Sequence, residues 1–153
     1  MIAAPEPAVS APVPELGPDA LLAALRASAG SVVEGTELGS WRDAPDVSAL
    51  SDARAAAVLA AWTGARLHAG APGLIAATDA DVALLVGDWC YAHALQALAH
   101  GGDLAAIGVL ATAIGACATA LSTADLPQSD GLTRLATIWQ GVTDTLADPD
   151  APR

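Results

Sequence analysis

The chain has 153 residues, of which 54% are apolar, and six Lys or Arg against seventeen Asp or Glu give a formal net charge of −11. This length suits one domain, and the apolar content is sufficient for a single core. The acidic excess repels anions, which argues against nucleic acid, anionic lipid surfaces and free diphosphates as direct ligands.

The two ends of the chain are predicted to lie outside the folded domain. Residues 1–17 are rich in Pro and Ala and lack the basic segment of a secretory signal. We expect a disordered, partly polyproline-like arm there and a disordered tail at residues 148–153. A cytoplasmic location is therefore expected, where Cys90 and Cys117 stay reduced. The sequence leaves open whether these two thiols are close enough to pair.

The first predicted helix spans residues 18–29, because Pro18 fits a first helical turn and Gly30 follows the last apolar repeat. Residues 31–45 mix Gly, Ser, Thr and Pro. This composition predicts a loop, which we expect to hold Trp41 against the core.

The second predicted helix covers residues 53–68, with Ser48 or Ser51 as its N-cap. The last predicted helix covers residues 132–146. Its apolar side chains recur at helical spacing along one stripe, which consists of Leu132, Leu135, Trp139, Val142 and Leu146.

Two long apolar helices are predicted within residues 78–124. Thr78 followed three positions later by Asp81 resembles a capping box at the start of the first. The Gly-Gly-Asp turn at residues 101–103 ends this helix and caps the next. Since the connection is so short, we expect the two helices to be antiparallel neighbours.

Together these elements predict an all-α domain over residues 18–147, with about five main helices around the hairpin at residues 78–124 and no strand. Residues 104–121 carry no charge over a length that approaches a membrane span. Ala, Gly and Thr dominate them, however, and no Lys or Arg lies between Arg66 and Arg134 to anchor either end. We therefore expect a fully buried core helix and no transmembrane segment.

Asp88 is the only acid within the apolar run of residues 82–99. A carboxylate in a buried helix is costly unless a specific partner satisfies it. If the hairpin turns at its central glycine pair, Asp88 lies level with Gly115, whose missing side chain lets the helices approach. We predict that Asp88, Gly87 and Gly115 form a structural hub that fixes the register of the hairpin.

The sequence contains no catalytic constellation and no metal site that we recognise. His93 and His100 share a helix face, but metal pairs on helices are usually three or four residues apart. No Ser or Cys occupies a strand-turn-helix elbow, and a phosphate loop needs a lysine that the chain lacks. The tryptophans fit either an Ala-rich core or an apolar pocket. Trp89, His93 and Trp139 are the candidates for contact with a partner or ligand.

Residues 84–99, with their Gly-Asp pair, resemble the L-x-G-D helix of all-α trans-polyprenyl diphosphate synthases. The resemblance is greatest to the small non-catalytic subunits of heterodimeric hexaprenyl and heptaprenyl synthases. In those subunits a short polar turn and another long helix follow, as they do here. The resemblance covers residues 78–121, less than a third of the chain.

Catalytic members of that family hold magnesium and an allylic diphosphate with two D-D-x-x-D motifs and with Arg and Lys side chains. This chain has no such motif and no Lys. The resemblance therefore implies an accessory subunit, not catalytic alone, that packs on a larger catalytic subunit and helps set product chain length. It binds no cofactor itself, and Mg²⁺ is expected only on that partner.

The alternative is a stand-alone helical protein. In that case the chain would associate with a second copy of itself, bind an apolar small molecule, or serve as an interaction module.

Overall fold

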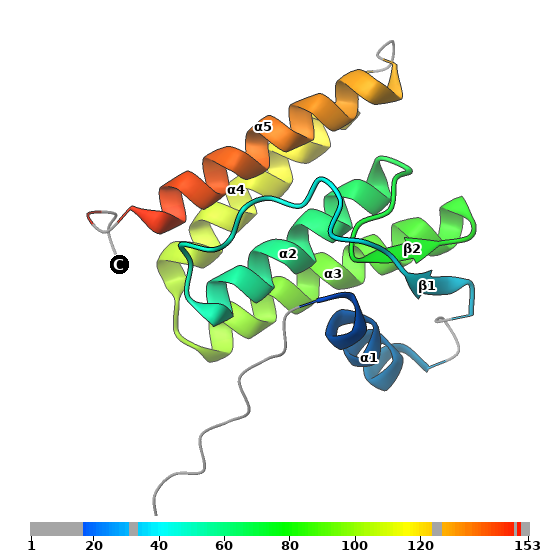
Figure 1. Ribbon diagram of the computed structural model, residues 1–153, viewed down its shortest axis with the longest axis horizontal. Coiled ribbons are helices and arrows are strands. Elements are labelled where there is room, and N and C mark those ends of the chain that lie inside the picture. Colours follow the sequence, from blue (N-terminus) through cyan, green and yellow to red (C-terminus); the bar gives the residue numbers. More distant parts are fainter. Residues whose placement is uncertain (1–16, 31–33, 124–126, 149, 151–153) are drawn as a thin grey trace, which may run out of the picture.

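The computed structural model describes residues 17–30, 34–123, 127–148 and 150, and it confirms an all-α fold with five helices. Figure 1 shows α4 and α5 running side by side along one edge of the molecule, with α2 and α3 as a second pair and α1 below them. The helices are α1 (Pro18–Ala29), α2 (Asp52–His68), α3 (Ala80–His100), α4 (Leu104–Leu121) and α5 (Gln128–Ala147).

Two three-residue strands, which the sequence did not predict, join the loop before α2 to the segment before α3. β1 (Thr36–Leu38) pairs antiparallel with β2 (Ile75–Ala77). The ladder continues beyond the strands, because the Gly39 and Ser40 amides donate to carbonyls of the segment before β2. Strands this short cannot show the alternation of polar and apolar residues that sequence analysis relies on.

α2 is the central helix, and most of its residues are buried. Of the two predicted caps it is Ser51 that caps the helix, because its hydroxyl oxygen accepts from the Arg54 amide. Trp62 and Trp139 are buried, so of the two alternatives for the tryptophans these two belong to the core. Trp41 is largely exposed, so the expectation that the loop holds it against the core is wrong.

α2 and α3 approach each other closely at two glycines. The space beside Gly64 is occupied by the Gly87 carbonyl oxygen, 2.8 Å from where a Cβ would lie, and by the Tyr91 ring. A Cβ on Gly87 would collide with the His68 ring. The two backbones can therefore be this close only because both positions lack a side chain.

α3 and α4 are joined by the predicted tight turn, but they do not form an isolated hairpin. α3 packs mainly against α2, and α4 packs mainly against α5. Asp103 caps α4 as expected, accepting from the Ala106 amide. At the start of α3 the cap is Asp79, which accepts from the Val82 amide, so the predicted capping role of Thr78 is wrong.

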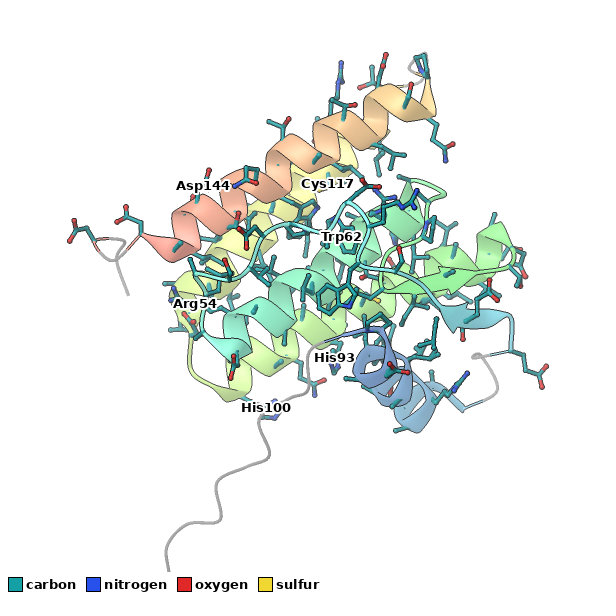
Figure 2. All side chains as sticks on the ribbon, in the orientation of Figure 1. Arg54, Trp62, His93, His100, Cys117 and Asp144 are labelled. Carbon is teal, nitrogen blue, oxygen red and sulfur yellow. The ribbon has the colours of Figure 1, made fainter. Side chains whose placement is uncertain are left out.

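Arg54 links three helices near this turn (Figure 2). Its Nε lies 2.7 Å from Asp103 Oδ2 and its Nη2 lies 3.1 Å from Oδ1, which is a bidentate ion pair. Its Nη1 donates to the Leu146 carbonyl oxygen at the end of α5. The guanidinium holds the pKa of Asp103 below its ordinary value. One side chain thus fixes the start of α2, the start of α4 and the end of α5 relative to one another.

We predict that Gly87→Ala lowers the free energy of unfolding by about 1–3 kcal/mol, because the added methyl group must displace the His68 ring. Gly115→Ala is the matched control, since a Cβ there meets open space. At Gly115 the substitution should raise the free energy of unfolding by about 0.5–1 kcal/mol, because alanine favours a helix more than glycine does. Urea denaturation measures both changes, and equal effects at the two positions would contradict the close contact between α2 and α3.

Candidate functional site

Asp88 is exposed, which corrects the prediction of a buried carboxylate. Its side chain is 72% accessible to solvent, because no described helix covers the outer face of α3. Gly115 is also exposed, with open space around it. Gly87 alone is buried, and it packs against α2 and not against α4. The predicted hub of these three residues is therefore not assembled.

The partner of Asp88 is His68, from the last turn of α2. His68 Nε2 lies 3.1 Å from Asp88 Oδ1, although the two are not aligned for a regular hydrogen bond. The His68 ring also packs against Tyr91, with 5.2 Å between ring centroids. Burial raises the pKa of Tyr91 above its ordinary value. Sequence analysis missed this cluster because the contact at Gly64 and Gly87, which brings the residues together, leaves no local signal.

The cluster of His68, Asp88 and Tyr91 has limited chemical capacity. It offers one imidazole, one solvated carboxylate and one phenol. Among the described residues, no group of three or more His, Cys, Asp or Glu side chains could hold a metal ion. An ion pair with so exposed a carboxylate contributes little in water. The geometry therefore supports a structural contact.

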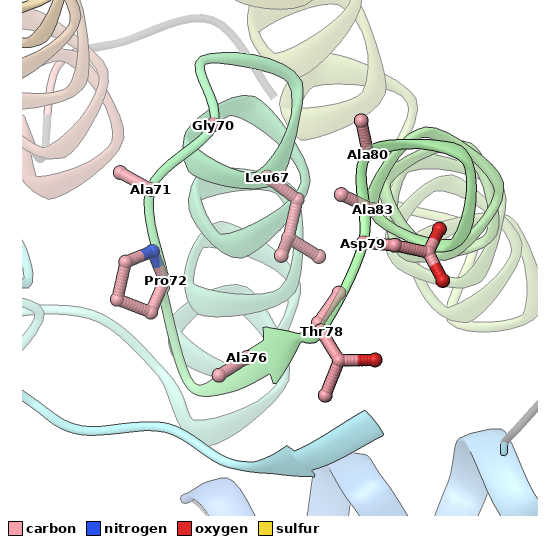
Figure 3. A pocket seen from close by; sticks show the side chains of 10 residues that line it. Leu67, Gly70, Ala71, Pro72, Ala76, Thr78, Asp79, Ala80 and Ala83 are labelled. Carbon is pink, nitrogen blue, oxygen red and sulfur yellow. The ribbon is translucent and has the colours of Figure 1, made fainter. Parts of the chain in front are cut away.

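A pocket of about 380 Å³ lies nearby, between the end of α2 and the start of α3 (Figure 3). Its walls are mostly Ala, Gly and Pro, with Leu67 on one side. Its polar side chains are Thr78 and Asp79, and the Asp79 carboxylate already caps α3. No cationic side chain lines the pocket.

Trp89, one of the candidate contact residues, joins α3 to α1, and His93, another of them, packs beside it. The Trp89 indole Nε1 donates to Ser28 Oγ over 2.9 Å. The Trp89 ring stacks on His93, with ring centroids 4.6 Å apart and ring planes at 16°. Burial lowers the pKa of His93. Trp139 is buried in the core, so the expectation that it contacts a partner is wrong.

Cys90 and Cys117 are buried free thiols. Burial raises the pKa of Cys90 to about 12 and that of Cys117 to about 11. At Cys117 the Trp139 indole partly offsets this rise in pKa. Since the thiolate is the reactive form, both side chains are poor nucleophiles at neutral pH. They act as small core residues.

The two most apolar helices are only partly covered by the rest of the domain. By length and composition α3 and α4 are each apolar enough to cross a membrane, which by itself is weak evidence. Only 33% of the apolar window in α3 and 22% of that in α4 is buried. The expectation that residues 104–121 form a fully buried helix is therefore wrong. Four residues of α4 face the core, which are Ala106, Leu110, Ala113 and Cys117.

Comparison of the chain with protein-family models, with curated proteins and with solved structures gives no match. The functional argument therefore depends on the chain's own residues and surfaces.

We predict that stability decreases as the pH falls from about 7 to about 5, because His93 is harder to protonate in the folded protein than in the unfolded chain. The unfolded state then binds more protons below the ordinary histidine pKa, which shifts the equilibrium toward unfolding. Denaturation midpoints across this range measure the effect. His93→Gln should weaken the dependence of stability on pH. His100→Gln, at an exposed position, should leave this dependence unchanged. Equal slopes for both variants would contradict this assignment.

Proposed function

We propose that this chain is a non-catalytic helical subunit that docks on the larger catalytic subunit of a polyprenyl diphosphate synthase. The supporting observation is the outer face of α3, defined here by Leu84, Leu85, Asp88 and Ala92. This helix carries the resemblance to the small synthase subunits, and all four residues on this face are exposed.

Leu84 and Leu85 are 49% and 58% exposed, although they are adjacent large apolar residues in a regular helix. Full burial of a leucine side chain is favourable by about 1.5–3 kcal/mol relative to leaving it exposed to water. Exposed apolar groups gathered on one helix are typical of an interaction surface. A partner that covers this face would gain most of its binding energy from these two side chains.

A protein partner fits this face better than a bilayer does. Asp81 and Asp88 are exposed on the same helix, and a charged side chain in the hydrocarbon core is costly. No Lys or Arg lies between Arg66 and Arg134 to anchor α3 or α4 to lipid headgroups.

The charge of the chain also suits this partner. A catalytic prenyl synthase subunit needs Arg and Lys to bind diphosphates, whereas this chain has a net charge of −11. Opposite charges speed association and favour the correct partner over another acidic chain. In such a complex Leu84 and Leu85 would contribute to the apolar wall along which the growing prenyl chain extends, which is how the subunit would influence product length.

We predict that the chain co-elutes with the catalytic subunit of a long-chain polyprenyl diphosphate synthase encoded in the same genome, and that it lengthens the products. Co-expression followed by size-exclusion chromatography measures assembly, and chromatography of the dephosphorylated products measures chain length. Leu85→Glu should weaken the complex about 10-fold or more, because it removes apolar burial and places a charge in the contact. Leu38→Glu is the matched control, since Leu38 is 51% exposed but lies on β1.

Two results would contradict this proposal. One is separate elution of the two chains together with synthase activity that does not depend on this chain. The other is equal weakening by Leu85→Glu and Leu38→Glu, which would show that the outer face of α3 is not the contact. The first result would favour the stand-alone helical protein.

A further inference from the structure

Two exposed glycines within the helices α4 and α5, Gly108 and Gly141, have no packing role inside the domain, a property that they share with Gly115. A Cβ at Gly108 or at Gly141 would meet no atom within 4 Å. A mid-helix glycine costs about 0.5–1 kcal/mol relative to alanine. Close packing inside the domain explains Gly64 and Gly87, but it does not explain these two. Their lack of side chains would matter only to something that approaches from outside.

Gly108 and Gly141 both line a groove of about 690 Å³ between α4 and α5. No charged side chain lines it, although the chain has a net charge of −11. On the α4 side the wall consists of small residues, including Thr112 and Ala116, which allow a helix to approach closely. On the α5 side Ile138 is only partly buried, so part of its apolar surface is open to a partner.

Beside the groove, α5 carries a stripe with opposite charges at its two ends. Arg134, Ile138, Gly141 and Thr145 lie on one side of α5, and Asp148, the C-cap residue of the helix, follows at the same spacing of four and three residues. Arg134 lies seven residues before Gly141 and Asp148 lies seven residues after it. Both charged side chains are exposed, and neither makes an ion pair with another described residue, although the Asp148 carboxylate accepts from the Asp150 amide.

A helix with this arrangement is complementary to itself when two copies cross antiparallel. A two-fold axis at Gly141 places Arg134 of one copy opposite Asp148 of the other, and the same pair recurs on the other side of the axis. We infer that the groove between α4 and α5 binds a second copy of this chain, with two α5 helices crossing at Gly141. This surface is separate from the outer face of α3, so the inference does not depend on the proposed function.

The dimer should be weak and reversible. The groove spans about three helical turns, and interfaces that bury less than about 1,200 Å² in total are typical of transient complexes. We therefore expect a dissociation constant on the order of 10–100 µM. Sedimentation equilibrium of the purified chain over a range of concentrations that brackets these values measures it.

Charge reversal tests the proposed arrangement. Arg134→Asp and Asp148→Arg each place like charges opposite one another, so each should weaken the dimer about 10-fold. The double variant restores opposite charges and should recover most of the lost affinity. The reversals should not harm the fold, because both side chains are exposed and neither makes an ion pair with another described residue. Circular dichroism checks that the helix content is unchanged.

Two glycine substitutions test the crossing point. Gly141→Leu should abolish the dimer while leaving the monomer folded, because the added side chain points into open space. Gly102→Ala is not a suitable control, since Gly102 has a positive φ of 72°. Gly115→Ala provides the control on α4 outside the groove, and it should leave the dimer intact.

Three outcomes would overturn the inference. They are a monomer at every concentration, a double charge reversal that binds no better than either single reversal, and a dimer that is lost on Leu85→Glu but unaffected by Gly141→Leu. The last outcome would assign self-association to the outer face of α3.

Discussion

The contact between α2 and α3 at Gly64 and Gly87 determines how the rest of the molecule is arranged. The two backbones are so close that no side chain fits between them. This contact fixes which face of α3 is buried, and residues on the opposite face are left to solvent. It also places His68 next to Asp88. Gly87 and Asp88 thus have different roles, because Gly87 packs against α2 and Asp88 points to solvent.

Arg54 supplies the second constraint, at the opposite end of the helix pair. Its bidentate contact with Asp103 fixes the turn between α3 and α4, and its bond to the Leu146 carbonyl fixes the end of α5. Since both partly buried charges are paired and hydrogen-bonded, the interaction orients α4 and α5 over α2 without leaving an unsatisfied group there. The groove between α4 and α5 follows from this orientation.

The features that sequence analysis predicted correctly are those with a local cause. Helix spans follow from apolar spacing, and the caps at Ser51 and Asp103 follow from residues adjacent to the helices they cap. Asp88 was assigned to the interior because its neighbours in sequence are apolar. Its exposure depends instead on α3 pairing with α2, a contact between residues far apart in sequence. The short strand pair escaped prediction for the same reason.

The hydropathy of α4 shows why an apolar pattern does not by itself establish burial. A core helix and a helix that contacts another chain can have the same uncharged composition. Only the tertiary structure distinguishes the two. Here just 22% of the apolar window of α4 is buried, although the seventeen acidic residues of the chain all lie outside this helix. Single exposed apolar residues are common on protein surfaces, but a whole uncharged helix face on an acidic protein is not. Contact with another apolar surface would remove this face from water.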